Sequence, residues 1–167
     1  MKPESVDQSS VARLSKAALA AAAALWVLLA AFDNVVDYDS NFQFVRHVLE
    51  MDSTFPGNAG LSRAIHAPIL HHAAYVLIIT VEFAVAILSG FGAIRMALAH
   101  ADPARFRRAR VPAIAGLTLG ILLWLVGFEV IAGEWFMMWQ SRIWNAQESA
   151  FRFVAALGVI LVYISLE

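Results

Sequence analysis

Residues 70–94, LHHAAYVLIITVEFAVAILSGFGAI, form the apolar run that decides the fold of this chain. A helix needs about 20 mainly apolar residues to cross the ~30 Å hydrocarbon core of a bilayer. Three more runs reach or approach that length, so we expect spans at about residues 14–32, 70–94, 111–132 and 149–166. Hydrophobic residues make up 60% of the chain and charged residues 15%, whereas soluble domains are nearer 45–50% and ~25%. We therefore predict an all-α membrane protein, a bundle of four transmembrane helices in one domain, residues 1–167.

The distribution of basic residues predicts the orientation of the bundle. They cluster before the first run and between the second and third, at Lys2, Arg13, Lys16, Arg95, Arg105, Arg107, Arg108 and Arg110. By the positive-inside rule both chain ends face the cytoplasm, and segments 33–69 and 133–148 are external. The first run also has the basic start and apolar stretch of a signal peptide. It lacks a pair of small residues before a suitable cleavage point, which favours an uncleaved helix.

A short amphipathic helix is predicted inside the first external segment. Ser40 would be its N-cap and Gln43 the reciprocal partner in a capping box. The spacing that follows indicates a helix lying at the membrane surface or over the bundle. Its apolar face holds Phe42, Val45, Val48 and Leu49, and its polar face holds Gln43, Arg46, His47 and Glu50. A turn at residues 55–58 would end it, and a second short helix over about residues 58–66 would lead to the next span.

The second external segment is rich in tryptophan. Tryptophan is a normal anchor at the membrane interface, which explains one or two of these residues. Three tryptophans within ten residues, with polar neighbours, favour a packed cap, and both interpretations stay open. The candidate cap residues are Asp37, Asn41, Arg46, His47, Glu134, Trp135, Trp139, Gln140, Trp144, Asn145 and Gln147.

Ionisable residues within the spans are the strongest chemical signal. Glu82, Glu129 and Arg152 lie in three different runs, where a charge is costly unless it is paired or hydrated. Because side chains tilt toward the N-terminus of their own helix, all three can meet in the outer third of the bundle. Glu148 can pair with Arg152 at i, i+4. One interpretation is a structural ion-pair cluster. The other is a binding or proton-handling site, since one arginine cannot neutralise three carboxylates.

Histidines extend this candidate site. His71, Tyr75 and Glu82 share one face of their helix, and His72 points elsewhere. Histidines beside carboxylates suggest a metal site, but the chain has no HxxxH or HExxH motif. The metal candidates His71, His72, His47 and His66 are therefore weak, and haem is weaker because the other three spans hold no histidine. No cofactor is predicted, and we expect His71 or His72 to make an interfacial hydrogen bond.

Small residues recur on one face of the third run. Gly116 and Gly120 form a small-xxx-small pair, and Gly127 follows two turns later. Such a stripe lets helices approach closely. Packing within the bundle is the safer expectation, and contact with another subunit is the alternative.

Three stretches carry a resemblance to a known family. They are DYxSNFxFVxHVLxMDxTFP at residues 37–56, HHAAY at residues 71–75, and GEWFxMWQ at residues 133–140 with Trp144, Asn145 and Gln147. Together they resemble the bacterial family of predicted small integral membrane proteins catalogued as domain of unknown function 2165. The resemblance covers the chain except about the first dozen residues. It implies a four-span protein of the bacterial inner membrane and supplies no activity.

Two functions follow as hypotheses. In the first, the chain is a non-catalytic module that binds a partner protein, lipid or small ligand through its external cap, as an accessory subunit of a membrane complex. In the second, the outer carboxylate and histidine pocket binds a solute, proton or metal ion for transport or a membrane reaction. The chain shows no hydrolase, kinase, P-loop or dinucleotide motif, which favours a protein that is not an enzyme. The expected partners are the lipid bilayer and another membrane protein or a second copy, and nucleic acid is not expected.

Overall fold

The computed structural model describes residues 8–166, and every regular element within them is helical. Four helices are long and apolar enough to cross a membrane: Ser9–Val36, Pro68–Leu98, Pro103–Trp135 and Gln147–Ser165. The predicted fold class, a four-span helical bundle, is confirmed. In chain order the elements are α1 (Gln8–Val36), α2 (Tyr38–Glu50), η1 (Ala59–Arg63), α3 (Pro68–Leu98), α4 (Pro103–Ala109), α5 (Val111–Leu122), η2 (Leu123–Trp135), η3 (Met138–Gln140) and α6 (Gln147–Ser165).

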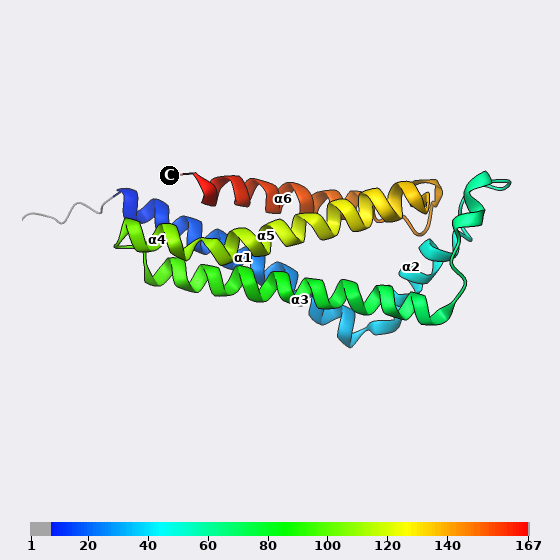
Figure 1. Cartoon of the computed structure of the whole chain (residues 1–167), viewed down its shortest axis with the longest axis horizontal. Coiled ribbons are helices and arrows are strands. Elements are labelled where there is room, and N and C mark those ends of the chain that lie inside the picture. Colours follow the sequence, from blue (N-terminus) through cyan, green and yellow to red (C-terminus); the bar gives the residue numbers. More distant parts are fainter. Residues whose placement is uncertain (1–7, 167) are drawn as a thin grey trace, which may run out of the picture.

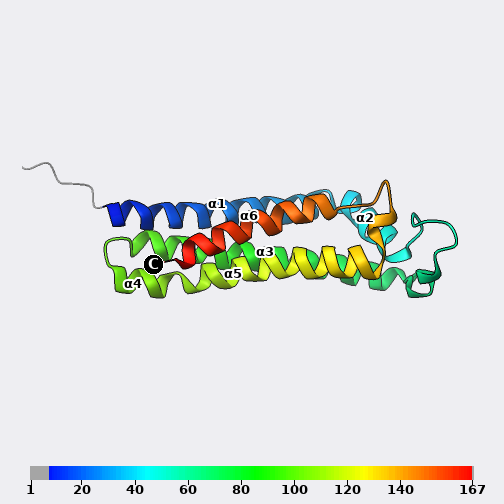
Figure 2. The same ribbon diagram turned by 90° about the horizontal axis from the view of Figure 1, so that it is seen from above.

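The four spans pack into a closed ring. α1 packs mainly on α3, α3 on α5, α5 on α6, and α6 returns to α1. Figures 1 and 2 show α4 at one end of the long bundle, where α1 begins and α6 ends, and α2 at the other end. We call these the arginine end (residues 99–110 with the adjoining ends of α1 and α6) and the cap end (residues 37–67 and 136–146). The assignment of the cap end to the outer face of the membrane stays a prediction.

Glycines let α5 approach its neighbours inside the bundle. A Cβ at Gly116 would lie 2.5 Å from Ser89 Oγ, and one at Gly120 would lie 2.8 Å from Leu157 Cδ1. Both distances are far below van der Waals contact. A Cβ at Gly116 would also lie 2.7 Å from the Ser89 backbone nitrogen and would require a shift of α3, whereas at Gly120 the nearest atoms belong to side chains. Packing within the bundle is confirmed for this pair. At Gly127 a Cβ would meet within 4 Å only an atom of its own helix.

The third span changes its hydrogen-bonding period halfway along. α5 continues without a break into η2, which is a π-helix of 13 residues. The backbone N–H of Phe136 donates to the Ile131 oxygen, five residues earlier, at 3.0 Å. π-Helical turns are rare and occur frequently at functional sites. Residues of η2 line two cavities at the cap end, which are described below.

Two local predictions for the cap end are wrong. α2 begins at Tyr38 with Asp37 as its N-cap, three residues earlier than predicted, so Ser40 lies in its first turn. The Ser40 hydroxyl donates to Asp37 Oδ2 at 2.7 Å, and Gln43 Nε2 donates to Asp39 Oδ1 at 2.9 Å. The capping box is therefore replaced by side-chain pairs within the first turns.

The short helix predicted over residues 58–66 is a five-residue 3-10 helix, η1. Asn58 Oδ1 accepts from the Gly60 N–H at 2.7 Å and caps it. α2 itself ends before the predicted turn, because Met51 adopts a left-handed conformation with φ of 53°. Gly57 has φ of +75° in the turn that follows.

Candidate functional site

A polar chamber lies under α2 at the cap end. Its volume is about 410 Å³, and it is lined from α1, α2, α3, η2, the loop before α6, and α6 itself. Its floor is an aromatic stack. Phe153 lies between Trp124, at 3.9 Å between ring centroids, and Trp26, at 4.1 Å. The stack joins α1, η2 and α6, and Trp124 and Phe153 line the chamber.

Asn34 connects two buried residues of α3 in this chamber. Its Nδ2 donates to Glu82 Oε2 at 2.8 Å. Tyr75 Oη donates to the Asn34 backbone oxygen at 3.0 Å and lies 3.3 Å from Asn34 Oδ1. His71, Tyr75 and Glu82 are 1%, 1% and 4% exposed. The shared face predicted for these three residues is thus the buried face of α3.

Glu82 is the chemically unusual residue of the chamber. It lies within a membrane span, and within residues 8–166 it makes one hydrogen bond and no ion pair. Its second oxygen, Oε1, has no hydrogen-bond partner in the same range. A carboxyl group in this position calls for a proton, a cation or a hydrogen-bond donor at its free oxygen.

The predicted meeting of Glu82, Glu129 and Arg152 does not occur as an ion-pair layer within residues 8–166. Arg152 is exposed and pairs with Glu148 at 2.5 Å, which is the i, i+4 contact expected from the sequence. Glu129 Oε2 accepts from Gln147 Nε2 at 3.4 Å, and its Oε1 is buried without a partner. The three charges sit on separate helices that face different surroundings, so the argument from tilt alone was insufficient.

An apolar chamber adjoins the polar one. It has a volume of about 500 Å³ and lies between α2, α3, α5 and η2, lined throughout by apolar side chains and a glycine. Leu77, Leu122 and Val126 line it and are 63%, 50% and 40% exposed on the bundle surface. The chamber therefore opens sideways between the spans, toward the surface that faces lipid.

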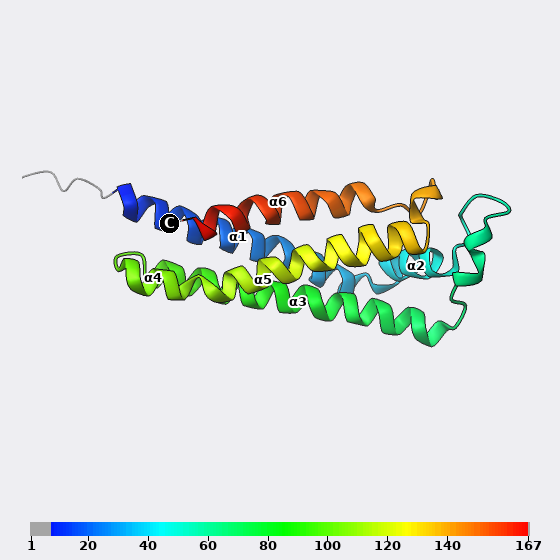
Figure 3. The same cartoon turned by 45° about the horizontal axis from the view of Figure 1, so that its top comes forward.

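α2 lies at the cap end of the bundle (Figure 3). It lines both chambers, and we call it their roof. Phe44 and Val45 of α2, with Ile78 and Phe128 of the spans, line both cavities. The rings of Phe44 and Phe128 are stacked at 6.4 Å. One layer of side chains therefore separates the apolar chamber from the polar chamber. The volumes of both chambers are typical of small-molecule sites.

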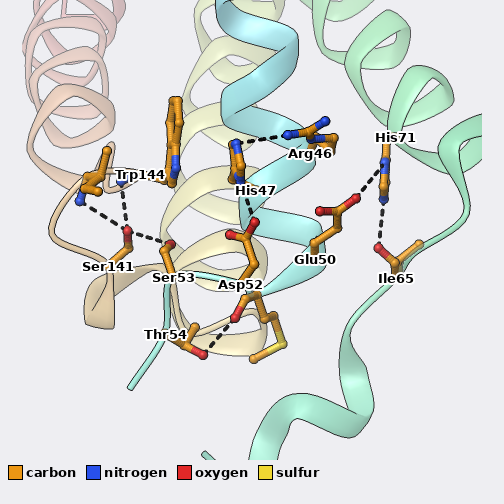
Figure 4. Close-up of polar contacts among 12 residues, drawn as sticks. Arg46, His47, Glu50, Asp52, Ser53, Thr54, Ile65, His71, Ser141 and Trp144 are labelled. Carbon is orange, nitrogen blue, oxygen red and sulfur yellow. Dashed lines mark hydrogen bonds and ion pairs between the residues drawn. The ribbon is translucent and has the colours of Figure 1, made fainter. Parts of the chain in front are cut away.

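Polar contacts on the other faces of α2 hold this roof in place (Figure 4). His47 Nδ1 donates to Asp52 Oδ2 at 2.6 Å, and His47 Nε2 accepts from Arg46 Nη2 at 3.2 Å. These roles follow because a carboxylate only accepts and a guanidinium only donates. His71 Nε2 donates to the Ile65 oxygen at 2.8 Å, while its Nδ1 lies 3.9 Å from Glu50 Oε1.

The second histidine of α3 supports α2 from its outer side. His72 stacks on Phe42 at 4.1 Å between ring centroids, and its Nδ1 lies 2.9 Å from Tyr38 Oη. His71 and His72 each make a hydrogen bond, and the expectation that one of them lies at the membrane interface stays a prediction. Each histidine contacts α2 or the segment that follows it. The main role of both histidines is therefore to position α2.

A three-residue group near the roof has the composition of a metal site. His47, Glu50 and Asp52 offer ligand atoms that all lie within 4.8 Å of one another. Of the four histidines predicted as weak metal candidates, His47 alone belongs to this group. Its Nδ1 donates to Asp52, so metal binding there requires loss of that proton and of the hydrogen bond. His66 and His72 are exposed and lie outside the group.

Each tryptophan of segment 133–148 contacts a residue of segment 33–69. Trp144 stacks on His47 at 4.5 Å, Trp139 meets Phe55 edge-on at 5.8 Å, and the Arg63 guanidinium lies 5.0 Å above the Trp135 ring. Trp135 and Trp139 nevertheless remain 55% and 47% exposed. The same residues can therefore pack the cap and contact the membrane interface, so the two interpretations from the sequence are compatible.

Hydrogen bonds join the same two segments. Ser53 Oγ donates to Ser141 Oγ at 2.8 Å, and Gln140 Oε1 accepts from the backbone N–H of Phe55 at 3.0 Å. Ser141 Oγ also accepts from the Trp144 N–H at 2.8 Å. The sequence did not single out Ser53 or Ser141, because isolated serines in a loop carry no pattern.

The remaining predicted cap residues are spread over the rim. Asn41 and Asn145 are exposed at the polar chamber. Asp37 accepts the hydrogen bond from the Ser40 hydroxyl. Glu134 is exposed. The sequence also missed Asn34, which organises the chamber. A polar side chain directly after the first apolar run was the available signal.

Comparison with known proteins identifies a family and nothing closer. The family model described as "Predicted small integral membrane protein (DUF2165)" matches residues 12–167. This agrees with the resemblance drawn from the three motifs. No curated protein and no solved structure matches the chain.

Proposed function

The chain belongs to this family of predicted small integral membrane proteins, and on that premise we propose that it is a non-catalytic module that binds a small amphipathic molecule beneath α2. The polar chamber would hold a cationic or hydrogen-bond-donating head group. The adjoining apolar chamber would hold the hydrocarbon part. The observation that carries this proposal is the buried Glu82 carboxyl, which lines the polar chamber with one oxygen unpartnered within residues 8–166.

The surroundings of Glu82 favour a donor ligand over an anion. Of the described residues that line the polar chamber, Glu82 is the only Asp or Glu, and no Lys or Arg lines it. The Asn34 amide already occupies one carboxyl oxygen, which fixes the side chain and leaves Oε1 available. In a medium of low dielectric constant, a charge-assisted hydrogen bond to that oxygen is strong.

The apolar chamber favours a ligand with a hydrocarbon part. Its lining offers no charged residue, and it is open on the lipid-facing surface. An amphipathic molecule dissolved in the bilayer can enter between the spans with its chain leading or following. Binding of this kind needs no catalytic group, which agrees with the lack of catalytic motifs in the sequence.

A matched pair of probes tests the proposal. The purified full chain in neutral detergent is titrated with dodecylammonium and, separately, with dodecanoate, and the thermal unfolding temperature is followed. Dodecylammonium should raise it and dodecanoate should not, because ligand binding to the native state stabilises by mass action. Glu82→Gln should weaken the dodecylammonium effect at least about tenfold in apparent Kd, since truncation of a buried charged partner costs about 2–5 kcal/mol.

Glu129→Gln is the control variant. It removes a carboxyl group at the same end of the bundle, outside the lining of the polar chamber. It should bind dodecylammonium like the parent protein. Equal stabilisation by the two probes, or full retention of binding by folded Glu82→Gln, would contradict the proposal.

A second candidate function is cation binding near the roof, which the His47, Glu50 and Asp52 group favours. The cation would be bound by three side-chain ligands, none of which lines either chamber. Elemental analysis of the purified protein after equilibration with Zn²⁺ distinguishes it. One equivalent in the parent and none in His47→Gln supports this candidate, and an equal result in both rejects it.

A further inference from the structure

Three arginines surround one surface pocket at the arginine end. The pocket has a volume of about 320 Å³, and no carboxylate is among its lining residues. Arg95 lies in the last turn of α3, and Arg105 and Arg108 are three residues apart on α4. Residues at that spacing lie on the same side of a helix. The α3–α4 turn thus brings three guanidinium groups around one hollow.

These arginines form no close ion pair in the described part of the chain. None of them forms an ion pair with a carboxylate of residues 8–166. Asp102 acts on Arg105 and Arg108 through its charge, but its Oδ1 already accepts from two backbone N–H groups, at 2.9 and 3.1 Å. Its role is to cap α4. The Arg95 guanidinium lies 5.6 Å from the centroid of the Phe91 ring, a contact that occupies none of its N–H groups. The N–H groups of the three arginines therefore remain available to bind an anion.

A second basic pocket at the same end behaves differently. There Lys16 Nζ donates to the Leu166 oxygen at 2.5 Å, and Arg110 Nη1 donates to the oxygens of Ile164 and Leu166, each at 2.9 Å. Those cations satisfy carbonyl groups at the C-terminal end of α6, where positive charge is favourable. They have a structural task that Arg95, Arg105 and Arg108 do not share.

An apolar strip leads from the three-arginine pocket along α3. Leu98 lines the pocket and is 80% exposed, and Ile94 and Phe91 continue the strip at 61% and 54% exposure. These residues lie within a candidate membrane span. A molecule bound here would meet arginines at one end and lipid-facing hydrocarbon along its length.

We propose that this pocket binds the phosphate-bearing head group of an anionic phospholipid, with its acyl chains lying along the strip. Guanidinium groups match phosphate through paired hydrogen bonds, and basic pockets between spans are suited to such head groups. The site is separate from the two chambers at the cap end. It does not depend on the function proposed for them.

The test uses the full chain in neutral detergent, with added phosphatidylglycerol or phosphatidylcholine, and counts retained lipid by native mass spectrometry. Phosphatidylglycerol should be retained in preference. Arg95→Gln, Arg105→Gln and Arg108→Gln should each reduce its retention about fivefold, from the usual contribution of one basic residue near an anionic head group. The matching lysine variants should fall between parent and glutamine variants, because lysine keeps the charge and loses the paired geometry.

Arg107→Gln is the matched control. It lies on the same helix and removes the same charge, but it lines the other basic pocket. Its effect should stay below about twofold, and circular dichroism should show all variants folded. An equal loss for Arg107→Gln would show general charge attraction and overturn the site. Equal binding of soluble glycerol phosphate would overturn the lipid assignment in favour of a free phosphate.

Discussion

Replacement of Asn34 by leucine tests the polar network at its centre. The Asn34 side chain donates to Glu82 at 2.8 Å and lies 3.3 Å from the Tyr75 hydroxyl. Tyr75 keeps its stronger bond to the Asn34 backbone oxygen at 3.0 Å, which the substitution preserves. The change therefore removes mainly one hydrogen bond, the one that Glu82 accepts. Leucine has a similar size and adds no polar atom.

The expected loss of stability is about 2 kcal/mol. A hydrogen bond to a charged group contributes about 1.5–3 kcal/mol, and a buried acceptor left without a partner loses this in full. Added apolar burial offsets part of the loss, by up to about 1 kcal/mol. For a chain of this length, 2 kcal/mol corresponds to a fall of about 4–8 °C in Tm. Asn41→Leu is the control, because Asn41 is exposed at the same chamber and its change should stay within about 0.5 kcal/mol.

The assay is thermal unfolding in neutral detergent, repeated in a Glu82→Gln background. There the acceptor is a neutral amide, so Asn34→Leu should cost about 1 kcal/mol less, and this difference measures what the carboxyl group adds to the hydrogen bond from Asn34. Identical costs in both backgrounds would mean that the carboxyl group of Glu82 is no better an acceptor for Asn34 than a neutral amide. A parent-like Tm for Asn34→Leu would refute the network as a stabilising element.

Three further outcomes follow from other parts of the bundle. Gly116→Ala places a Cβ 2.7 Å from a backbone nitrogen of α3. This overpacking should lower the free energy of unfolding by about 1–3 kcal/mol. Gly158→Ala is the control, because its Cβ would meet no neighbouring atom within 4 Å and should not lower Tm. Arg152→Gln breaks only the exposed pair with Glu148 and should change stability by less than about 0.5 kcal/mol. The pKa of Asp102 lies below its ordinary value because a backbone N–H in the first turn of α4 donates to its carboxylate. Its capping contribution is therefore present above the ordinary carboxyl pKa and lost as pH falls through the lower folded value, which hydrogen exchange of the α4 amides can follow.

The sequence predicted the spans and one helix face correctly, because these depend on local periodicity. Apolar runs of membrane-crossing length need no knowledge of their neighbours. His71, Tyr75 and Glu82 fall on one side of any α-helix, and that side is buried. By contrast, the meeting of Glu129 and Arg152 depends on how each helix is rotated about its axis. Rotation is decided by packing between helices, and tilt and depth carry no information about it.

Other features were beyond the sequence for a different reason. At the early start of α2, Tyr38 stacks on Phe42 at 5.7 Å and meets Tyr75 of α3 edge-on at 4.6 Å. The capping rule does not weigh such ring contacts. The π-helical turns of η2 have no sequence signature. Asn34 was overlooked because it stands near the end of an apolar run, where a single amide resembles the start of a loop.

The choice of glutamate at position 82 separates a structural role from a binding role. A glutamine there would accept the same hydrogen bond from Asn34 and would avoid the cost of a charge in a membrane span. If Glu82 served packing alone, the charge would bring no benefit. Glu82→Gln should therefore be at least as stable as the parent in unfolding experiments and should lose dodecylammonium binding. A variant that unfolds several degrees earlier would instead show that the carboxyl group itself stabilises the bundle, and the ligand argument would lose its basis.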